Sequence, residues 1–282
     1  MTSLSFSLID PEKPALSVRE NNGVVWLESP LFHGYKGLVH GFTTRLGGVS
    51  CGYLSSMNLS FASEREHPEH VRENFRRLAE SVGFDASSLV FSSQMHTTNV
   101  LRVGKSDTGC GTLREYGWDN VDGFITDEPG VTPAVFSADC VPVLFFDPVR
   151  RAIGAAHSGW RGTAAGIVRV LIRRMSDEFG SDPGNLLVTV GPAICRKCYE
   201  VSEEVAERFP ASCSIKKPDG KYLLDLHRAN EILLLDSGIL PGHLFISNLC
   251  TSCNNELLFS HRATGGRRGL TAGFIGLLRD PS

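Results

Sequence analysis

The stretch Asp122–Thr163, DGFITDEPGVTPAVFSADCVPVLFFDPVRRAIGAAHSGWRGT, decides the fold class of this 282-residue chain. It consists of short apolar segments separated by Asp, Gly, Pro and Arg, a pattern typical of β-strands joined by tight turns. Within it, Val141–Phe146 (VPVLFF) is apolar at every position rather than at alternate positions. Such a continuous run indicates a strand that is covered on both faces, as in layered α/β proteins.

The rest of the chain alternates between similar strands and helical stretches. Strands are expected at Val24–Leu27, Leu38–Phe42, Leu89–Phe91, Val100–Val103, Gly123–Thr126, Pro133–Phe136, Val141–Phe146, Ala152–His157, Leu186–Val190, Leu244–Ser247 and Leu270–Leu277. Apolar residues at helical spacing predict helices over Pro68–Val82, Thr163–Phe179 and Asp225–Ser237, each followed by a glycine that can end it. The stretch Lys216–Gly220, KKPDG, is expected to form a surface turn. The pattern predicts an α/β fold, a layered α-β-α sandwich with a mixed β-sheet, in one domain over residues 1–282.

The amino-acid composition limits the kinds of molecule that the protein is expected to bind. Hydrophobic residues make up 41% and charged residues 21% of the chain, and its net charge is −3. These values are those of a globular protein and argue against nucleic acid as a partner. The N-terminus lacks the pattern of a signal peptide, and no apolar run approaches the ~18 residues of a membrane span, so we expect a cytoplasmic protein without a membrane partner. The eight cysteines then indicate metal binding or catalysis rather than a disulfide framework.

Three residues stand out as candidates for chemistry. Cys140 follows one predicted strand and His157 ends another, so the two side chains could meet at neighbouring strand ends of one sheet. His96 lies in the polar segment SSQMHTTNV, whose side chains, Gln94 among them, could support a metal-bound imidazole. Taken singly, a cysteine is most often a small buried hydrophobic residue and a histidine a structural one. The combination, with Asp139 beside Cys140, favours a functional site.

Two arginines are candidates for binding an anion. Arg161 lies in SGWRG, where glycines and a following helix could bring backbone N–H groups to an anion. Arg45 precedes a Gly-Gly pair in HGFTTRLGGVS. A guanidinium is well suited to phosphate or carboxylate. The simpler alternative for Arg161 is a structural ion pair with a carboxylate.

The cysteines also form two CxxC pairs, Cys195/Cys198 and Cys250/Cys253. Such pairs usually indicate a structural zinc site. However, 52 positions separate Cys198 from Cys250, whereas a compact zinc ribbon has about 15–20 residues there. A zinc ion held by all four cysteines stays open as a hypothesis, as do unrelated roles for the two pairs.

Several motifs in order resemble one family, which has been known as laccase-domain or polyphenol-oxidase-like proteins. That family is now regarded as zinc-dependent purine nucleoside phosphorylases with adenosine deaminase and methylthioadenosine phosphorylase activity. The resemblance extends over about residues 38–278. It is carried by HGFTTRLGGVS, MNLS (57–60), QMH (94–96), DGFIT, SADCVPVLFFD, AAHSGWRG, VGPAIC, CYEV (198–201) and FSHR (259–262).

The resemblance implies zinc ligands at His96, Cys140 and His157, with Cys140 as the active-site cysteine and an α/β sandwich as the fold. It also implies a purine nucleoside and phosphate as partners. Three ligands leave a place open at the zinc, where water can be activated near neutral pH, which would account for deamination of adenosine. Our own expectations are that Arg45, Arg161 and Gln94 bind substrate or phosphate and that Asp139 moves a proton. The chain departs from the family pattern at Thr97 and in ATGGRRGL (263–270).

Three alternatives remain at this point. Cys140 could be the nucleophile of a metal-free hydrolase or transferase with a histidine as its base. Two histidines and one cysteine could instead bind copper, as in a polyphenol oxidase, although no H-x-H pair is present for further copper ions. The four paired cysteines could stabilise a binding module that is not an enzyme.

Overall fold

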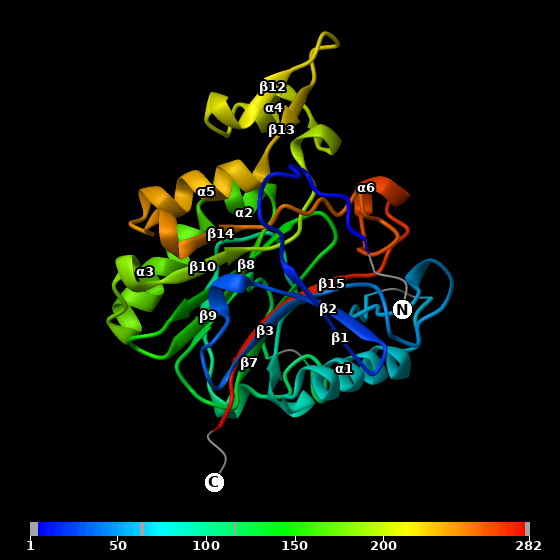
Figure 1. Ribbon diagram of the computed structural model, residues 1–282, viewed down its shortest axis with the longest axis vertical. Helices are drawn as coiled ribbons and strands as arrows, with labels where there is room; N and C mark the ends of the chain where they lie inside the picture. Colours follow the sequence, from blue (N-terminus) through cyan, green and yellow to red (C-terminus); the bar gives the residue numbers. More distant parts are fainter. Residues whose placement is uncertain (1–4, 63–64, 116, 280–282) are drawn as a thin grey trace.

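The structure, a computed structural model, describes residues 5–62, 65–115 and 117–279. Two six-stranded mixed sheets form its centre, and a small three-stranded sheet lies apart from them (Figure 1). The first sheet contains, in spatial order, β1 (Ser17–Asn21), β2 (Val24–Glu28), β3 (Leu38–Thr43), β15 (Thr271–Leu277), β7 (Thr132–Ser137) and β4 (Leu89–Val90). The second contains β14 (Leu244–Ile246), β10 (Leu187–Val190), β8 (Val141–Asp147), β9 (Ala152–Ser158), β6 (Gly123–Thr126) and β5 (Val100–Arg102).

Strand β8 shows why the two sheets stack. All seven of its residues are buried, as its continuous apolar sequence predicts. Leu144 and Phe146 belong to the core between the sheets, where they join Phe42 of β3 and Ile275 of β15. The alternate residues, represented by Phe145, belong to a second core on the other face. Because side chains of a strand alternate between its faces, a strand that is apolar throughout needs a cover on both sides.

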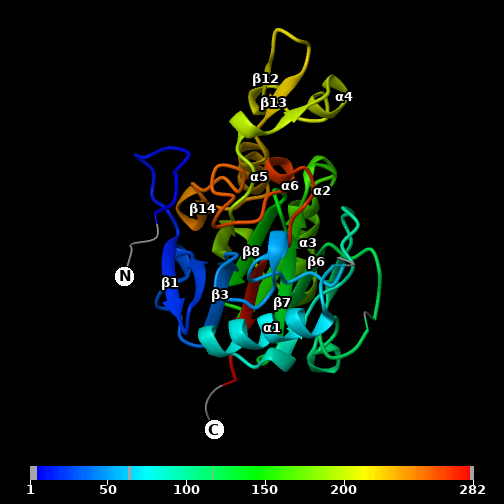
Figure 2. The ribbon, with the colours of Figure 1, turned by 90° about the vertical axis from the view of Figure 1, so that its right-hand side faces the viewer.

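Helices cover the two outer faces (Figures 1 and 2). The helix α1 (Pro68–Val82) packs Val71, Phe75 and Leu78 on residues of the first sheet. The helices α3 (Ile167–Phe179) and α5 (Leu226–Asp236) pack on the second sheet in the other outer core. Burying each large apolar side chain stabilises the fold by about 1.5–3 kcal/mol. The layer order is therefore helix, sheet, sheet, helix.

The predicted α/β layered class with mixed sheets is confirmed, and its β layer consists of two sheets. Each of the eleven predicted strands is present, with bounds shifted by two residues at most. The prediction of a helix over Thr163–Phe179 is wrong at its start. The chain there forms a short α2 (Trp160–Ala164) and then turns at Gly166, whose φ of 79° suits a residue without a side chain, before α3 begins.

The elements that the sequence pattern missed are short or polar. Strand β1 is largely exposed, and β11 (Glu200–Val201), β12 (Ser214–Lys216) and β13 (Tyr222–Leu224) have only two or three residues each. So short a segment carries no readable periodicity. With α4 (Glu203–Ala206), these three strands form the projection at the top of Figure 1. The predicted turn Lys216–Gly220 joins β12 to β13 within it.

The last short helix, α6 (His261–Thr264), precedes β15. Among the described residues, no helix combines the length and the apolar character needed to cross a bilayer. The one-domain prediction over residues 1–282 includes both chain ends, of which 1–4 and 280–282 lie outside the described residues, and it stays a prediction.

Candidate metal centre and its pocket

Strand register brings the predicted site residues to one edge of the second sheet. In the antiparallel pair β8–β9, Pro142 lies opposite His157, so Cys140, two residues earlier, comes next to the end of β9. In the pair β6–β9, Gly123 lies opposite Ala156, which places Asp122 at the same edge. His96 reaches this edge from the loop between β4 and β5. Residues far apart in sequence meet here because antiparallel neighbours begin and end at shared edges.

His96, Cys140 and His157 form a compact cluster. Their ligand atoms, one from each side chain, all lie within 4.8 Å of one another. The Cys140 Sγ is 3.8 Å from the His96 Nε2, and the two imidazole rings lie edge to face with centroids 4.8 Å apart. A single metal ion with bonds of about 2.0–2.3 Å can bridge such separations. The structure therefore brings together the three residues that the sequence singled out.

Asp122, which sequence reasoning did not single out, organises this cluster. Its carboxylate, fully buried, accepts a hydrogen bond at 2.8 Å from Nδ1 of His157. It also accepts the backbone N–H groups of Met95, His96 and Thr97 at 3.1, 3.0 and 2.8 Å. These bonds hold His96 in a left-handed conformation with φ of 61°. One carboxylate thus positions both histidines and turns Nε2 of His157 toward the cluster.

The charges of the site favour an ionised carboxylate and an ionised thiol. Burial opposes ionisation of Asp122, but hydrogen bonds from His157 and Thr97 outweigh it and lower its pKa to about 2. Burial likewise raises the pKa of Cys140, yet the facing His157 and His96 lower it to about 6. Burial lowers the pKa of His157, and Cys140 and Asp122 raise it to about 9. The thiolate is the form of cysteine that binds metals.

Because Gly159 has no side chain, it leaves room for the side chains of His96 and Cys140. A Cβ atom built on Gly159 would lie 2.6 Å from Cδ2 of His96 and 3.1 Å from Sγ of Cys140. The φ of Gly159 is −66°, which any residue can adopt, so the need for glycine here is steric.

We therefore expect Gly159→Ala to displace His96 and weaken metal binding at the cluster by about 10–100-fold, the range seen when the support of a ligand is lost. The measurement is competition for the metal against a chelator of known affinity. Gly242→Ala is the matched control, because a Cβ there meets nothing within 4 Å. Equal metal affinity in Gly159→Ala and Gly242→Ala would contradict this account.

A pocket of about 240 Å³ opens onto the cluster. Its volume is near the lower end of the range of small-molecule sites, about 300–1,000 Å³. It is lined by Leu59, Ser60, Phe61, Ala62, Phe91, Ser92, Ser93, Gln94, His96, Phe136, Ser137, Ala138, Cys140, His157, Arg268 and Leu270. One part of the lining is thus aromatic and aliphatic, and another carries the cluster and one arginine.

That arginine, Arg268, is the second residue that sequence reasoning missed as a site residue. Its Nε is buried and has no hydrogen-bond partner among the described residues. Burial lowers the pKa of Arg268, whereas the charges of Cys140 and Asp139 oppose this shift. A buried guanidinium N–H without a partner is a natural ligand for an anion. The signal that the sequence offers is the glycine-flanked pair of arginines in ATGGRRGL.

Gln94 and Arg45 bond to the backbone of the protein. Gln94 lines the pocket, but its amide donates to the carbonyl of Phe136 at 2.8 Å and accepts from the N–H of Phe136 at 2.6 Å. Arg45 is not among the residues of the pocket. Its guanidinium donates to the carbonyls of Ser55 and Asn255, at 2.7 Å each, and lies over the ring of Phe259. Both side chains therefore hold loops in place around the site.

Arg161 and Asp139 also lie outside the pocket lining. Arg161 is exposed, with its guanidinium 4.2 Å from the ring centre of Trp160. Arg161 lies within the five-residue helix α2, not before the start of a long helix. Asp139 has φ of 98°, and its carboxylate accepts from Oγ1 of Thr251 at 2.6 Å and from the N–H of Arg262 at 2.7 Å.

Fold and site together define a class of layered α/β proteins in which a cluster of two histidines and one cysteine lies at a pocket. The model of the family described as multi-copper polyphenol oxidoreductase laccase matches residues 39–278. The chain belongs to this family, which confirms the resemblance seen in its motifs.

Two proteins that this chain resembles carry the name purine nucleoside phosphorylase. The chain is 37% identical over 248 residues to purine nucleoside phosphorylase LACC1 of Mus musculus, covering 85% of this chain and 55% of the mouse protein. It thus spans about half the length of that relative. It is 37% identical over 251 residues to purine nucleoside phosphorylase YlmD of Geobacillus stearothermophilus, covering 86% of this chain and 91% of YlmD.

Solved structures agree with the fold. The crystal structure of YlmD from Geobacillus stearothermophilus superposes with a TM-score of 0.87 at 35% identity, covering 94% of this chain and 100% of that one. The crystal structure of the Bacillus licheniformis hypothetical protein YfiH gives a TM-score of 0.86 at 34% identity, covering 92% of this chain and 98% of that one.

Proposed function

We propose that the chain is a zinc-dependent enzyme that cleaves purine nucleosides with inorganic phosphate. Inosine, adenosine and methylthioadenosine are the proposed substrates, and deamination of adenosine is a further proposed activity. The observation that carries the proposal is the pocket in which a two-histidine, one-cysteine cluster lies with Arg268, whose buried N–H lacks a partner. The relatives named purine nucleoside phosphorylase support the substrate class.

The cluster fits zinc by its donor chemistry. His96, Cys140 and His157 offer two nitrogens and one sulfur, a set of three that is typical of catalytic zinc. Asp122 holds the Nδ1 proton of His157, so Nε2 is free to bind the metal. A zinc ion held there would supply a Lewis acid beside the purine. Because three ligands leave a place open for a solvent molecule, the same cluster supports the proposed deamination.

Phosphorolysis needs an anion held close to the ribose. A phosphate oxygen forms a bond to C1′, the glycosidic C–N bond breaks, and the departing base takes up, directly or through solvent, the proton that the hydrogen phosphate loses. Arg268 is the arginine of the pocket lining, and its Nε has no hydrogen-bond partner among the described residues, so we propose that it holds the phosphate. We propose Arg161 as a second cation for the substrate. Holding phosphate and nucleoside in line supplies a large part of such catalysis.

The remaining lining and the surrounding residues have positioning roles in this proposal. Phe61, Phe136 and Leu270 form an apolar wall that suits the flat face of a purine. Gln94 connects the loop of His96 to Phe136, and Arg45 acts through the loop carbonyls that it binds. Asp139, proposed from the sequence as a proton carrier, fixes the turn before Cys140 through its own hydrogen bonds.

The direct test is an assay of inosine with and without inorganic phosphate. We expect release of hypoxanthine together with ribose 1-phosphate only when phosphate is present, and loss of this release after chelation of the metal. Release of hypoxanthine at the same rate without phosphate would indicate hydrolysis and contradict the proposal. Adenosine and methylthioadenosine are tested in the same way for phosphate-dependent release of adenine, and inosine formed from adenosine without phosphate reports deamination.

We expect Arg268→Ala to raise the KM for phosphate by about 10–100-fold, because a hydrogen bond to a charged group contributes about 1.5–3 kcal/mol. The KM for inosine should change much less. The matched control is Arg267→Ala, since the neighbouring Arg267 is exposed and lies over the ring of Tyr53 rather than in the pocket. Equal KM values for phosphate in the two variants would show that Arg268 does not bind the phosphate.

Two rival functions make different predictions. The low pKa of Cys140, about 6, and its contact with histidines also suit a metal-free cysteine nucleophile. In that case activity survives chelation and is lost on alkylation of Cys140. A copper oxidase would show a thiolate–copper absorption band in copper-loaded protein, so absence of this band counts against copper.

A further inference from the structure

The fold brings together the two cysteine pairs that lie far apart in sequence. Strands β10 and β14 are parallel neighbours, with Val190 opposite Ile246, so the segments that follow them leave the sheet at the same edge. Beyond the strands, Ala193 and Cys250 still form a parallel bridge. The first segment carries Cys195 and Cys198, and the second carries Cys250 and Cys253. The long stretch of sequence between Cys198 and Cys250 contains the three-stranded sheet and α5.

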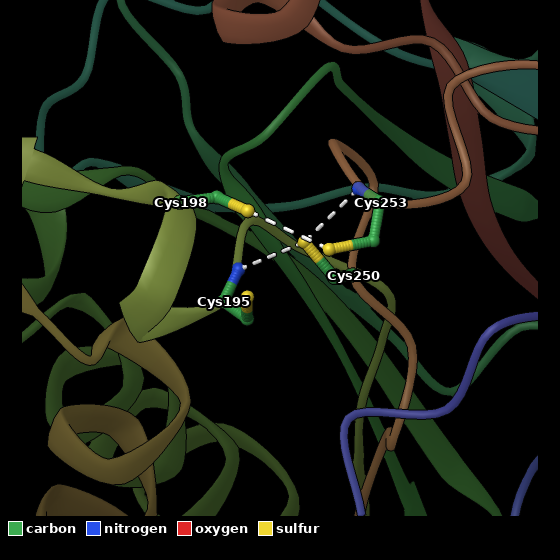
Figure 3. A group of neighbouring side chains, drawn as sticks. All are labelled: Cys195, Cys198, Cys250 and Cys253. Atoms are coloured by element: carbon green, nitrogen blue, oxygen red, sulfur yellow. Dashed lines mark hydrogen bonds between the residues drawn. The ribbon is translucent and has the colours of Figure 1, made fainter.

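The four sulfur atoms gather at one point. All four lie within 4.8 Å of one another, and Sγ of Cys198 is 3.5 Å from Sγ of Cys253. Figure 3 shows the side chains of Cys198, Cys250 and Cys253 directed toward one another between the two loops. Four thiolates bound to zinc at about 2.3 Å in a tetrahedron are themselves about 3.8 Å apart. The observed separations are compatible with a tetrahedral thiolate site.

The surroundings of these sulfurs also suit a metal site. Sγ of Cys250 accepts the backbone N–H of Cys195 at 3.2 Å and that of Cys253 at 3.4 Å. Cys195 and Cys250 are buried with Ile194 in a small core of their own, while Cys253 is exposed. Thiolates this close repel one another, and a bound divalent cation offsets that repulsion. Backbone N–H groups bonded to sulfur further favour the ionised form.

We propose that Cys195, Cys198, Cys250 and Cys253 bind a second metal ion, a thiophilic divalent cation such as zinc. Four protein ligands leave no place open for substrate, so the site is structural rather than catalytic. It lies in a different cluster from His96, Cys140 and His157. The proposal does not depend on the reaction that the pocket carries out.

The second site supports the active-site turn through two hydrogen bonds. Ile194, the residue before Cys195, donates its N–H to the carbonyl of Asp139 at 3.0 Å. Thr251, the residue after Cys250, donates its hydroxyl to the Asp139 carboxylate at 2.6 Å. Asp139 immediately precedes Cys140 and has φ of 98°, a conformation that needs support from its surroundings. A metal that joins the two cysteine loops thereby fixes the backbone beside Cys140.

The experiment is elemental analysis of the whole chain, prepared under reducing conditions and loaded with zinc. We expect about two zinc ions per chain in the unaltered protein, and about one in either Cys253→Ser or Cys140→Ala. The double variant should hold almost none. Cys51→Ser is the matched control, because Cys51 is an exposed free cysteine outside both clusters. It should keep about two zinc ions.

A second readout separates the sites by their sulfurs. Cobalt in place of zinc absorbs in proportion to its thiolate bonds, so removing the four-cysteine site should lower this absorption roughly fivefold, from five thiolates to one. If Cys253→Ser fails to fold, the four-cysteine site is tested instead by titrating the unaltered protein with an organomercurial reagent. The expected result is then the release of a second zinc ion per chain.

The proposal is overturned if the unaltered protein holds one zinc ion that Cys140→Ala removes and Cys253→Ser does not. It is equally overturned if mass spectrometry of protein prepared under reducing conditions finds Cys198 and Cys253 joined in a disulfide. Neither result bears on the proposed phosphorolysis, which is measured separately with inosine. If the protein does not catalyse phosphorolysis, the zinc count expected for Cys253→Ser stays the same.

Discussion

Replacing Cys140 by alanine is expected to abolish metal binding at the histidine–cysteine cluster and to reduce phosphorolysis of inosine by at least about 100-fold. Cys140 supplies the only sulfur of the three-residue cluster, and its thiolate would partly balance the charge of a bound metal ion. A loss of 100-fold is the lower bound for removing one preorganised electrostatic group from an active site. Zinc content and kcat/KM for inosine are the measurements.

The control for Cys140→Ala is Cys51→Ala, which removes an exposed thiol elsewhere and should leave both values unchanged. Full zinc content together with full activity in Cys140→Ala would mean that the cluster is not the active site. Loss of activity with zinc retained would instead point to Cys140 as a nucleophile, the metal-free alternative.

Replacing Asp122 by alanine should have the largest effect on stability. The buried carboxylate accepts hydrogen bonds from His157, from three consecutive backbone N–H groups and from the Thr97 hydroxyl, so its loss leaves the imidazole and the three backbone donors without this partner. Breaking a buried pair of this kind costs about 3–5 kcal/mol in the free energy of unfolding. The measurement is denaturant unfolding of the metal-free protein, so that weaker metal binding does not contribute.

Asp127 provides the matched control for Asp122. It follows the opposite end of β6, where its partly exposed carboxylate pairs with Arg102 at the surface. An exposed ion pair contributes about 0–1 kcal/mol, so Asp127→Ala should change stability little. If Asp122→Ala destabilised the protein no more than Asp127→Ala, the role assigned to Asp122 as the organiser of the cluster would be wrong.

The two aspartates beside the cluster both position its residues through hydrogen bonds. Asp122 orients His157 and the His96 loop, and Asp139 fixes the turn that presents Cys140. Each carboxylate is buried and bonded to the protein rather than directed into the pocket. The geometry of the cluster therefore depends on residues outside the cluster and outside the pocket lining, as is common for metal sites.

The amino-acid sequence by itself determined the layers and the three cluster residues. The continuous apolar run Val141–Phe146 predicted a strand covered on both faces because local periodicity reports directly which faces of an element are buried. The motifs around His96, Cys140 and His157 named the family, which the family model over residues 39–278 confirms.

Only the tertiary structure decided which distant residues meet. Asp122 became important because strand register places it at the end of β9, and Arg268 because it lines the pocket and its buried Nε has no partner among the described residues. Cys198 and Cys250 lie 52 positions apart in sequence, which argued against a shared site, yet parallel pairing of β10 with β14 closes that distance. Sequence spacing measures chain length, whereas a site depends on strand order and register, which arise from contacts across the whole fold.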